Sequence, residues 1–365
     1  MLRPHAALAQ RVARDVPLQS WSLPDALPAN GIEAARALVG AAILAPSYWN
    51  SQPWRFEVEG AEIRLALDAT RTLPECDPDQ RFVQISLGAA LENLLIAARA
   101  WGQHPSVQYL PWGPVARANS PWIAATVRWK GAEQHRDRLL FSALAERRTN
   151  PRVYDGRAIT MQSRAQLSAQ VPEELRLHWL DDRREIAAIA RHAAAATLAR
   201  AADRRAQGQR YAWVRMNNSE ARHRGDGMTP DNLGLGGPLN GFAARALDPR
   251  SRFHHWGVES LARDVHDAVR SSGAVALLTA PKRQDTSAII AGQAYERLAL
   301  TAATLGIAQQ PLSAPVESPR HRELLARAFG AAGEEPLLLV RLGHAHAPDP
   351  TPRRGVALVS TWRAS

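Results

Sequence analysis

Three polar side chains on one short loop have the types and spacing needed to bind the edge of a planar heterocycle. Ser47, Asn50 and Gln52 supply one hydroxyl and two amides within residues 45–56, Ala-Pro-Ser-Tyr-Trp-Asn-Ser-Gln-Pro-Trp-Arg-Phe. Each amide has both donors and an acceptor, which a ring edge with alternating donors and acceptors requires. The same residues are ordinary in loops, where they cap backbone groups, so residue chemistry alone leaves both interpretations open.

The elements expected around this loop would hold it between a helix and a strand. Residues 31–44 have an apolar stripe at helical spacing, and Pro46 disfavours helical backbone at the residue before it. Residues 55–59 alternate as a half-buried strand does, and Gly60 turns the chain into a second strand at 62–67. The loop is therefore expected to be short and fixed at both ends.

The order Ala-Pro-Ser-x-x-Asn-x-Gln-Pro-Trp after a helix resembles the flavin-contacting loop of the nitroreductase family, whose members bind FMN. The resemblance implies that Pro46, Ser47, Asn50 and Gln52 bind this cofactor. It also implies that the chain holds FMN as its cofactor and uses NAD(P)H as a partner.

Two arginine-containing segments resemble the elements that hold the FMN phosphate and ribityl chain in this family. A guanidinium suits a phosphate because it donates two parallel hydrogen bonds. The residues implied are Arg147, Arg148, Thr149, Asn150, Arg353 and Arg354. The first segment departs from the family pattern Arg-x-Ser-x-Arg, because Pro151 replaces the second arginine. A basic helix end that complements the helix dipole is the alternative interpretation of that segment.

Two strongly apolar helices are predicted at residues 84–102 and 288–306, and they align without a gap at an offset of 204 residues. Two glycine positions and one glutamate position match, namely Gly88 with Gly292, Gly102 with Gly306 and Glu92 with Glu296. Small residues would let the helices approach closely, and we interpret the repeat as a gene duplication. The family's homodimers bind FMN beside such crossing helices. The chain therefore resembles the Acg-like group, in which one chain carries two such halves.

The expected fold is α+β and nitroreductase-like, with two halves related by a pseudo-two-fold axis. We expect an N-terminal lead-in at 1–30, a first half at 31–145 and a second half at 146–365. A glycine-rich segment at 225–247 is expected to contain no regular element and to be either a lid over the site or a surface linker. No second Ser-x-x-Asn-x-Gln loop follows the helix expected at 184–207, so we expect one FMN per chain and a monomer that mimics the family's homodimer.

Composition limits the other classes of protein. The 365 residues carry a net charge of +10, but the arginines form no long basic run, so no nucleic acid is expected as a partner. One cysteine, Cys76, excludes an intramolecular disulfide and fits a reducing, cytoplasmic location. The sequence contains no run of about 18 uncharged apolar residues, so no membrane span is predicted. The histidine pairs lack acidic or cysteine neighbours at ligand spacing, so no metal is expected.

Hydride transfer is the chemistry that the resemblance implies. An FMN-dependent oxidoreductase would take hydride from NAD(P)H and reduce a small planar acceptor, such as a nitroaromatic or a quinone, through flavin N5. No side chain need act as nucleophile or base, so no catalytic residue is predicted. The alternative is an FMN storage or sensor protein, in which the glycine-rich segment closes the site and allows little turnover. A basic nucleic-acid-binding protein without flavin is the least favoured hypothesis.

Overall fold

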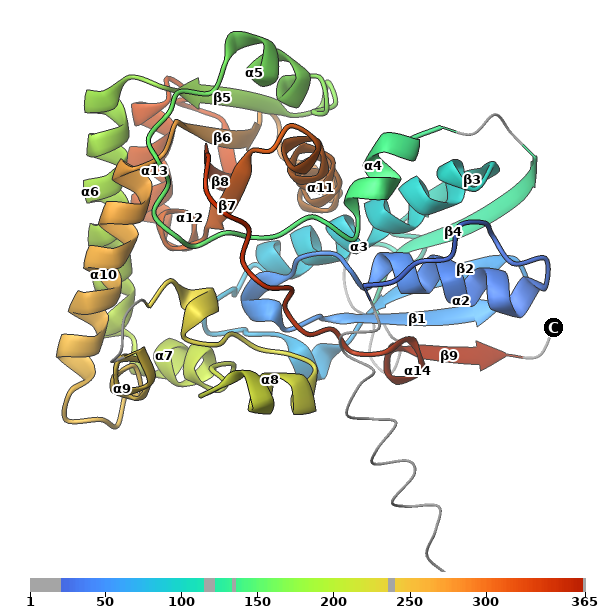
Figure 1. Ribbon diagram of the computed structural model, residues 1–365, viewed down its shortest axis with the longest axis horizontal. Coiled ribbons are helices and arrows are strands. Elements are labelled where there is room, and N and C mark those ends of the chain that lie inside the picture. Colours follow the sequence, from blue (N-terminus) through green and yellow to red (C-terminus); the bar gives the residue numbers. More distant parts are fainter. Residues whose placement is uncertain (1–20, 115–121, 133–135, 236–239, 364–365) are drawn as a thin grey trace, which may run out of the picture.

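The computed structural model describes residues 21–114, 122–132, 136–235 and 240–363, and Figure 1 labels its elements. These residues form an α+β fold with two β-sheets, one toward each side of the view, and helices between and around them (Figure 1). The first sheet has the strand order β3-β4-β2-β1-β9, and the second has the order β5-β6-β8-β7.

The strands differ in how much of their surface is buried. Those of the first sheet are β1 (Trp54–Glu59), β2 (Glu62–Leu67), β3 (Gln103–Tyr109), β4 (Ile123–Ala132) and β9 (Ser360–Arg363). Those of the second sheet are β5 (Arg176–Leu180), β6 (Ala274–Ala280), β7 (Ala308–Leu312) and β8 (Glu335–Gly343). β1 alternates between buried and more exposed residues, because one face of its mixed sheet packs on the core. β6 is buried along its whole length, as its uninterrupted apolar sequence indicates.

Helices surround both sheets and fill the space between them (Figure 1). They are α2 (Gly31–Ala42), α3 (Arg81–Ala100), α4 (Arg138–Ala143), α5 (Met161–Ser168), α6 (Arg183–Ala199), α7 (Arg204–Tyr211), α8 (Asn218–Arg224), α9 (Asn240–Ala246), α10 (His254–Arg270), α11 (Ser287–Thr304), α12 (Ala314–Glu317), α13 (Pro319–Ala328) and α14 (Val356–Val359). α6 and α10 pack side by side at one edge of the molecule, away from the first sheet.

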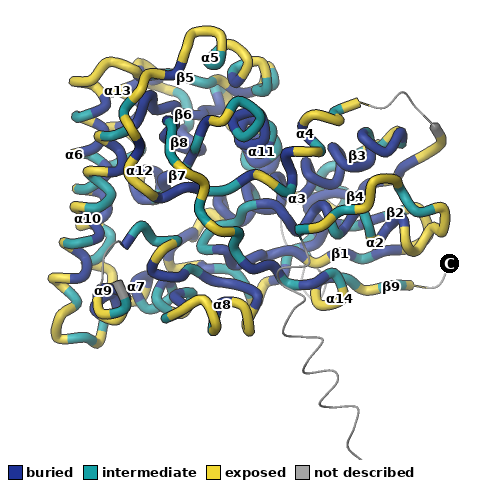
Figure 2. The backbone as a smooth tube through the Cα atoms, in the orientation of Figure 1, coloured by how far each residue is buried: buried dark blue, intermediate teal, exposed yellow. Residues whose placement is uncertain are grey.

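The helices α3 and α11 pack against each other at the centre, where the chain is most deeply buried (Figure 2). A Cβ atom at Gly88 would overlap the carbonyl oxygen of Ile289, and one at Gly292 would overlap the carbonyl oxygen of Ile85. The two contacts are reciprocal at the predicted offset, so the predicted close approach is confirmed. Within the described residues α3 is long and apolar enough to cross a membrane, but 94% of that stretch is buried inside the protein.

The matched glutamates of these two helices lie in different electrostatic surroundings. Arg297 donates to Glu92 Oε1 at 3.0 Å. Asn93, at the matching position of α3, donates to Glu296 Oε1 at 2.9 Å once its amide nitrogen is turned toward that oxygen. Each glutamate therefore accepts a hydrogen bond from the matching position of the opposite helix, but the donor is an arginine for Glu92 and a neutral asparagine for Glu296. Glu296 is fully buried, and its nearest cation is Arg147, whose Nε lies 3.3 Å from Glu296 Oε1.

Two expected extents are wrong. The helix expected at 184–207 is two helices, α6 and α7, because the side chain of Asp203 accepts hydrogen bonds from two backbone amides and starts a new helix. The segment 225–247, expected to contain no regular element, holds a 3₁₀ turn at Asp231–Leu233 and the helix α9. Residues 236–239 of this segment lie outside the described part of the chain.

The C-terminal tail crosses from the second sheet back to the first. After β8 the chain runs to β9, which pairs in parallel with β1 and sets Ser360 opposite Phe56. The predicted second half, 146–365, therefore includes β9, although this strand belongs to the sheet of the first half. Near this crossing, Trp21 Nε1 donates to Thr351 O at 3.0 Å, so the end of the lead-in lies against the tail. The rest of the lead-in, residues 1–20, is outside the described residues.

The close contact between α3 and α11 predicts that adding one methyl group there strongly destabilises the protein. Gly88→Ala should lower the free energy of unfolding by about 3 kcal/mol, because the added Cβ forces two backbones apart. Gly208→Ala in α7 is the control, since its Cβ would meet nothing within 4 Å. That change should leave stability unaltered or raise it by up to about 1 kcal/mol. Urea unfolding followed by circular dichroism measures both, and equal effects would contradict the contact.

Candidate functional site

A cavity of about 230 Å³ lies where the pair of central helices meets the loop that follows α2. α3 contributes Phe82, Ile85, Ser86 and Ala89 to its wall, and α11 contributes Tyr295. The end of β7, the connecting Ser313 and the start of α12 add the residues Gln310, Pro311, Leu312, Ser313, Ala314 and Pro315. The cavity is therefore built from both halves of the chain around the contact that joins them.

Seven of the ten residues predicted to bind the cofactor line this one cavity. They are Pro46, Ser47, Asn50, Arg147, Arg148, Thr149 and Arg353. Three others, Gln52, Asn150 and Arg354, do not line it. Segments about 100 and 300 residues apart in the sequence are thus brought together, while the three remaining residues hold the surrounding backbone.

The loop is held in an uncommon conformation by hydrogen bonds to α3 and within itself. Ser86 Oγ accepts from Tyr48 N at 3.0 Å, and Ser47 Oγ accepts from Gln52 N at 2.9 Å. Trp49 and Asn50 have φ angles of 55° and 50°, in the left-handed region that few side chains favour. The loop geometry therefore depends on these fixed partners, which is common where a backbone is shaped for a ligand.

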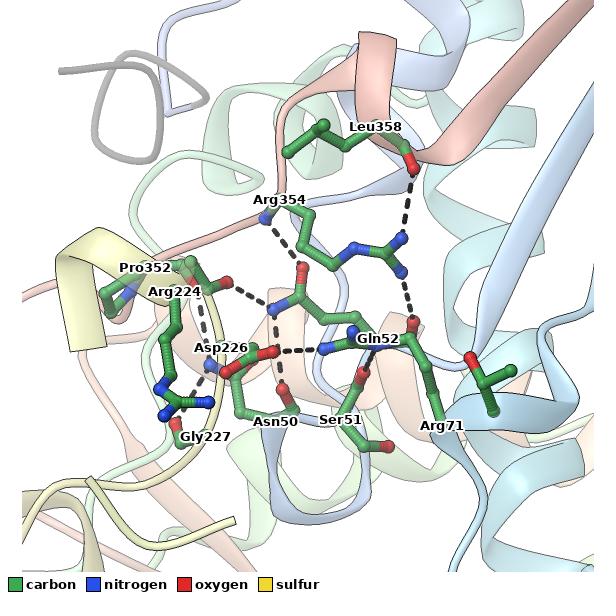
Figure 3. Close-up of polar contacts among 12 residues, drawn as sticks. Asn50, Ser51, Gln52, Arg71, Arg224, Asp226, Gly227, Pro352, Arg354 and Leu358 are labelled. Atoms are coloured by element: carbon green, nitrogen blue, oxygen red, sulfur yellow. Dashed lines mark hydrogen bonds and ion pairs between the residues drawn. The ribbon is translucent and has the colours of Figure 1, made fainter. Parts of the chain in front are cut away.

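The two loop amides connect the loop to the tail and to the glycine-rich segment (Figure 3). Gln52 Nε2 donates to Gly225 O at 2.7 Å, and Gln52 Oε1 accepts from Arg354 N at 2.8 Å. Asn50 Nδ2 donates to Gly227 O at 3.1 Å, and Asn50 Oδ1 accepts from Arg353 at 3.2 Å. Gln52 uses both ends of its amide in these bonds, so its role here is to fix three segments to one another.

The remaining two residues outside the cavity are likewise committed to the framework. Asn150 Nδ2 donates to His346 O at 2.8 Å, and Asn150 Oδ1 accepts from Arg152 N at 3.1 Å. Arg354 donates to Leu358 O and lies 3.6 Å from the carboxylate of Asp68. These bonds hold the arginine-containing segments in place.

Three arginines from two distant segments gather at one part of the wall. Arg147 and Arg353 both donate to the carbonyl oxygen of Leu44, at 3.4 and 3.2 Å. The guanidinium groups of Arg148 and Arg353 lie over the ring of Trp21, at 4.3 and 5.0 Å from its centroid. Stacking on an aromatic ring orients a guanidinium without neutralising it.

Among the described residues, the nearby acids Glu296, Glu146 and Asp349 only partly offset the positive charge of this cluster. Burial lowers the pKa of Arg353, and the neighbouring Arg147 lowers it further. Burial raises the pKa of Glu296 to about 7, so its carboxyl group is only partly ionised near neutral pH. Arg353 Nε and Glu296 Oε2 have no hydrogen-bond partner among the described residues. Asp349 is the acidic residue that lines the cavity itself.

This arrangement fits a phosphorylated planar ligand. Buried cations without enough counter-charge are stabilised by an anion, and a phosphate dianion matches three guanidinium groups. The apolar wall from α3 and from residues 311–315 suits a flat ring, since ligand pockets combine apolar surface with a few polar groups. The residues present could therefore hold FMN, as the sequence pattern predicts.

The first part of the glycine-rich segment forms a fixed wall of the cavity. Met228, Asn232 and Leu233 line it. Asp226 anchors this segment through ion pairs with Arg71 and Arg215 (Figure 3 shows the first of them). The segment is therefore tied both to the loop at residues 45–56 and to the connection between α7 and α8.

Some cavity residues were missed by the sequence reasoning. Trp21 lies in the lead-in, for which no site was predicted. Arg200 and residues 310–315 belong to no known motif of the sequence. An aromatic residue near several arginines is a weak signal that could have pointed to Trp21. Within the described residues, no group of three or more His, Cys, Asp or Glu side chains is arranged to hold a metal ion.

Comparison with known proteins gives relatives along nearly the whole chain. The chain is 28% identical over 342 residues to a Mycobacterium tuberculosis protein named "Putative NAD(P)H nitroreductase Rv3131", covering 90% of this chain and 92% of that protein. It is 30% identical over 130 residues to the "Putative NAD(P)H nitroreductase acg" of the same species, covering 35% of this chain and 37% of that protein. No protein-family model matches the chain.

Solved structures of nitroreductases overlap the fold in part. The FMN-dependent nitroreductase NfnB from Mycobacterium smegmatis, in complex with NADPH, is 15% identical with a TM-score of 0.37, covering 62% of this chain and 98% of that chain. A structure titled "putative nitroreductase" from Anabaena variabilis is 10% identical with a TM-score of 0.41. It covers 78% of this chain and 69% of that chain. The match to the first mycobacterial relative spans both halves of the present chain, so the resemblance inferred from the sequence motifs is confirmed. Over nearly its whole length the chain is similar to a protein named as an NAD(P)H nitroreductase.

Burial of Glu296 predicts a specific pH dependence of stability. Its pKa in the folded protein, about 7, exceeds the ordinary value of 4.5, so the folded state binds this proton more tightly than the unfolded state. The free energy of unfolding should therefore fall as the pH rises from 4.5 to about 7. The slope due to Glu296 is up to about 1.4 kcal/mol per pH unit.

Glu296→Gln should remove this part of the pH dependence. Urea unfolding of the cofactor-free protein at several pH values between 4.5 and 8 measures the difference between wild type and variant. The subtraction cancels other titrating groups, such as Asp77, whose pKa burial also raises. Parallel stability curves for the two proteins would contradict the assignment.

Proposed function

We propose that this protein is an FMN-dependent oxidoreductase that takes hydride from NAD(P)H and reduces small planar acceptors such as nitroaromatics or quinones. The observation that supports this most strongly is the cavity shared by the loop at residues 46–50 and the arginines 147, 148 and 353. The relatives named as NAD(P)H nitroreductases support the same activity.

The chain's own residues would bind and orient the cofactor. Arg147, Arg148 and Arg353 would offset the charge of the phosphate, and Thr149 would supply a hydroxyl beside it. Ser47 and Asn50 would meet the polar edge of the ring from the loop. When bound, FMN supplies the hydride acceptance and donation that no side chain can perform.

The protein would also control what reaches the ring. The apolar wall and the anchored residues Met228 and Leu233 would exclude bulk water from one side of the cavity. The cluster of arginines lies near the end of α4 and the tail, so it would hold the phosphate away from the part of the wall that Thr197 and Arg200 line. One cofactor per chain and a single-chain counterpart of a homodimer belong to this proposal.

A second candidate function is storage or sensing of FMN with little turnover. The ion pairs of Asp226 favour it, since they fix the glycine-rich wall and restrict access to the ring. The two functions differ in one observable property. A slow or absent reaction of the bound flavin with NAD(P)H would favour storage.

The absorbance spectrum of the purified protein tests the main proposal. Anaerobic addition of NAD(P)H should bleach the visible absorbance of the bound flavin, and a nitro compound or quinone should restore it. A protein that binds no FMN, even when FMN is added in excess, would contradict the cofactor assignment. A protein that binds FMN but is not bleached within minutes would contradict the oxidoreductase assignment alone.

The arginine cluster predicts the effect of one substitution on FMN affinity. Arg148→Met should weaken FMN binding about tenfold or more, because a charge-assisted contact to the phosphate is lost. Arg152→Met is the matched control, since that exposed arginine lies four residues on and does not line the cavity. Quenching of FMN fluorescence on binding measures both affinities. Equal losses in the two variants would show that net charge, rather than this site, sets the affinity.

A further inference from the structure

A second, smaller cavity adjoins the main one on the side away from the arginine cluster. Its volume is about 20 Å³, and four residues line both cavities: Trp49, Thr197, Arg200 and Leu261. None of the three arginines near the tail lines it. It is formed by α6, α7 and α10, which lie on the opposite side of the molecule from α4 and α14 (Figure 1).

Arg210 lines this small cavity and carries hydrogen-bond donors that the described residues do not use. Its side chain is 5% exposed, and Nη2 donates to Glu317 Oε2 at 2.7 Å. Its Nε and Nη1 atoms have no hydrogen-bond partner among the described residues. A buried guanidinium with unpaired donors is costly, so a ligand oxygen in this space would be stabilised.

The local charge balance also favours an anion. Glu317 is shared between two cations, with Arg200 Nη1 at 3.2 Å and Arg210 Nη2 at 2.7 Å. Burial alone would raise the pKa of Glu317, but the two arginines outweigh burial and lower it, so the carboxylate is ionised. Among the described residues, two guanidinium groups share this one carboxylate, which leaves one positive charge beside the main cavity without an acidic partner.

The size of the small cavity selects among anions. A space of about 20 Å³ admits one water-sized group, which is the size of a single carboxylate oxygen. A phosphate, with three free oxygens, is too large for it. Arg200 lines both cavities, so an acid group at the wall of the main cavity can contact Arg200 and reach Arg210 with one oxygen.

We propose that Arg200 and Arg210 form a carboxylate subsite, and that the preferred acceptors are planar aromatic or quinoid acids. This inference rests on the proposed function for the reaction, but the binding of a carboxylate can be measured separately. Arg200 and Arg210 would determine substrate specificity by holding the acid group, while the planar part of the acceptor lies in the main cavity. No covalent step is involved.

Paired substrates test the preference directly. The purified flavoprotein should reduce 4-nitrobenzoate with a kcat/KM about tenfold or more above that of the neutral, similarly shaped 4-nitrobenzamide, which corresponds to one charge-assisted hydrogen bond. Arg200→Met and Arg210→Met should each abolish this ratio, mainly through KM for the acid. Arg204→Met, on the exposed side of α7, changes the net charge equally and should keep the ratio.

A change of the opposite sign separates a binding role from a structural one. Glu317→Gln removes the internal counter-ion of both arginines, so it should increase the preference for the acid. A merely structural role of these residues would lower the reduction of both substrates in all three variants. If Arg210→Met does not fold, Arg200→Met and Glu317→Gln still decide the question.

Calorimetric titration with benzoate and benzamide provides a readout that does not require turnover. Benzoate should bind the wild type and the Arg204→Met variant, and it should not bind Arg200→Met. If this holds while neither nitro substrate is reduced, the subsite stands and the proposed oxidoreductase function fails. If the flavin is reduced by NAD(P)H and reoxidised equally well by acid and amide, and benzoate does not bind, the function stands and the carboxylate subsite is overturned.

Discussion

The backbone contact between α3 and α11 is the constraint on which the rest of the structure depends. Glycine at positions 88 and 292 lets each helix meet a carbonyl oxygen of the other, and any larger residue there would force the two apart. Because β-sheets from both parts of the chain pack on this helix pair, its geometry sets how the two parts face each other. The cavity lies directly on it, with Ile85 and Tyr295 in the wall. A change of helix spacing would therefore alter the site without touching a ligand-binding residue.

Buried charge is the second determinant of the architecture. The repeat places a glutamate on each central helix, but only Glu92 receives a cation from the opposite helix. Glu296 instead lies beside Arg147, within a cluster whose positive charge exceeds the acid available. Such a cluster is costly in an empty cavity and favourable around an anion. The departure from symmetry between the two halves thus coincides with the place where an anionic cofactor would bind, which is the physical basis for proposing one site per chain.

The parts of this structure that follow from local pattern could be predicted, and those that need distant partners could not. The hairpin of β1 and β2 and the two central helices follow from periodicity, and the matched glycines revealed their contact. The amide of Gln52 was predicted to contact the cofactor ring. In the fold, both ends of this amide instead bind other segments of the protein. β9 pairs with a strand about 300 residues earlier, and no short-range signal encodes such a pairing. The stacking of Arg148 on Trp21 is missed for the same reason, since 127 residues of sequence separate them.

Comparison of FMN with riboflavin tests the central claim most directly, because the two ligands share the ring and differ only in the phosphate. Calorimetric titration of the cofactor-free protein gives the stoichiometry and both affinities. The account predicts one FMN per chain and an affinity for riboflavin that is weaker by about a hundredfold or more, as expected when several charge-assisted hydrogen bonds are lost. Equal affinities for the two ligands, or two equivalent sites per chain, would contradict it.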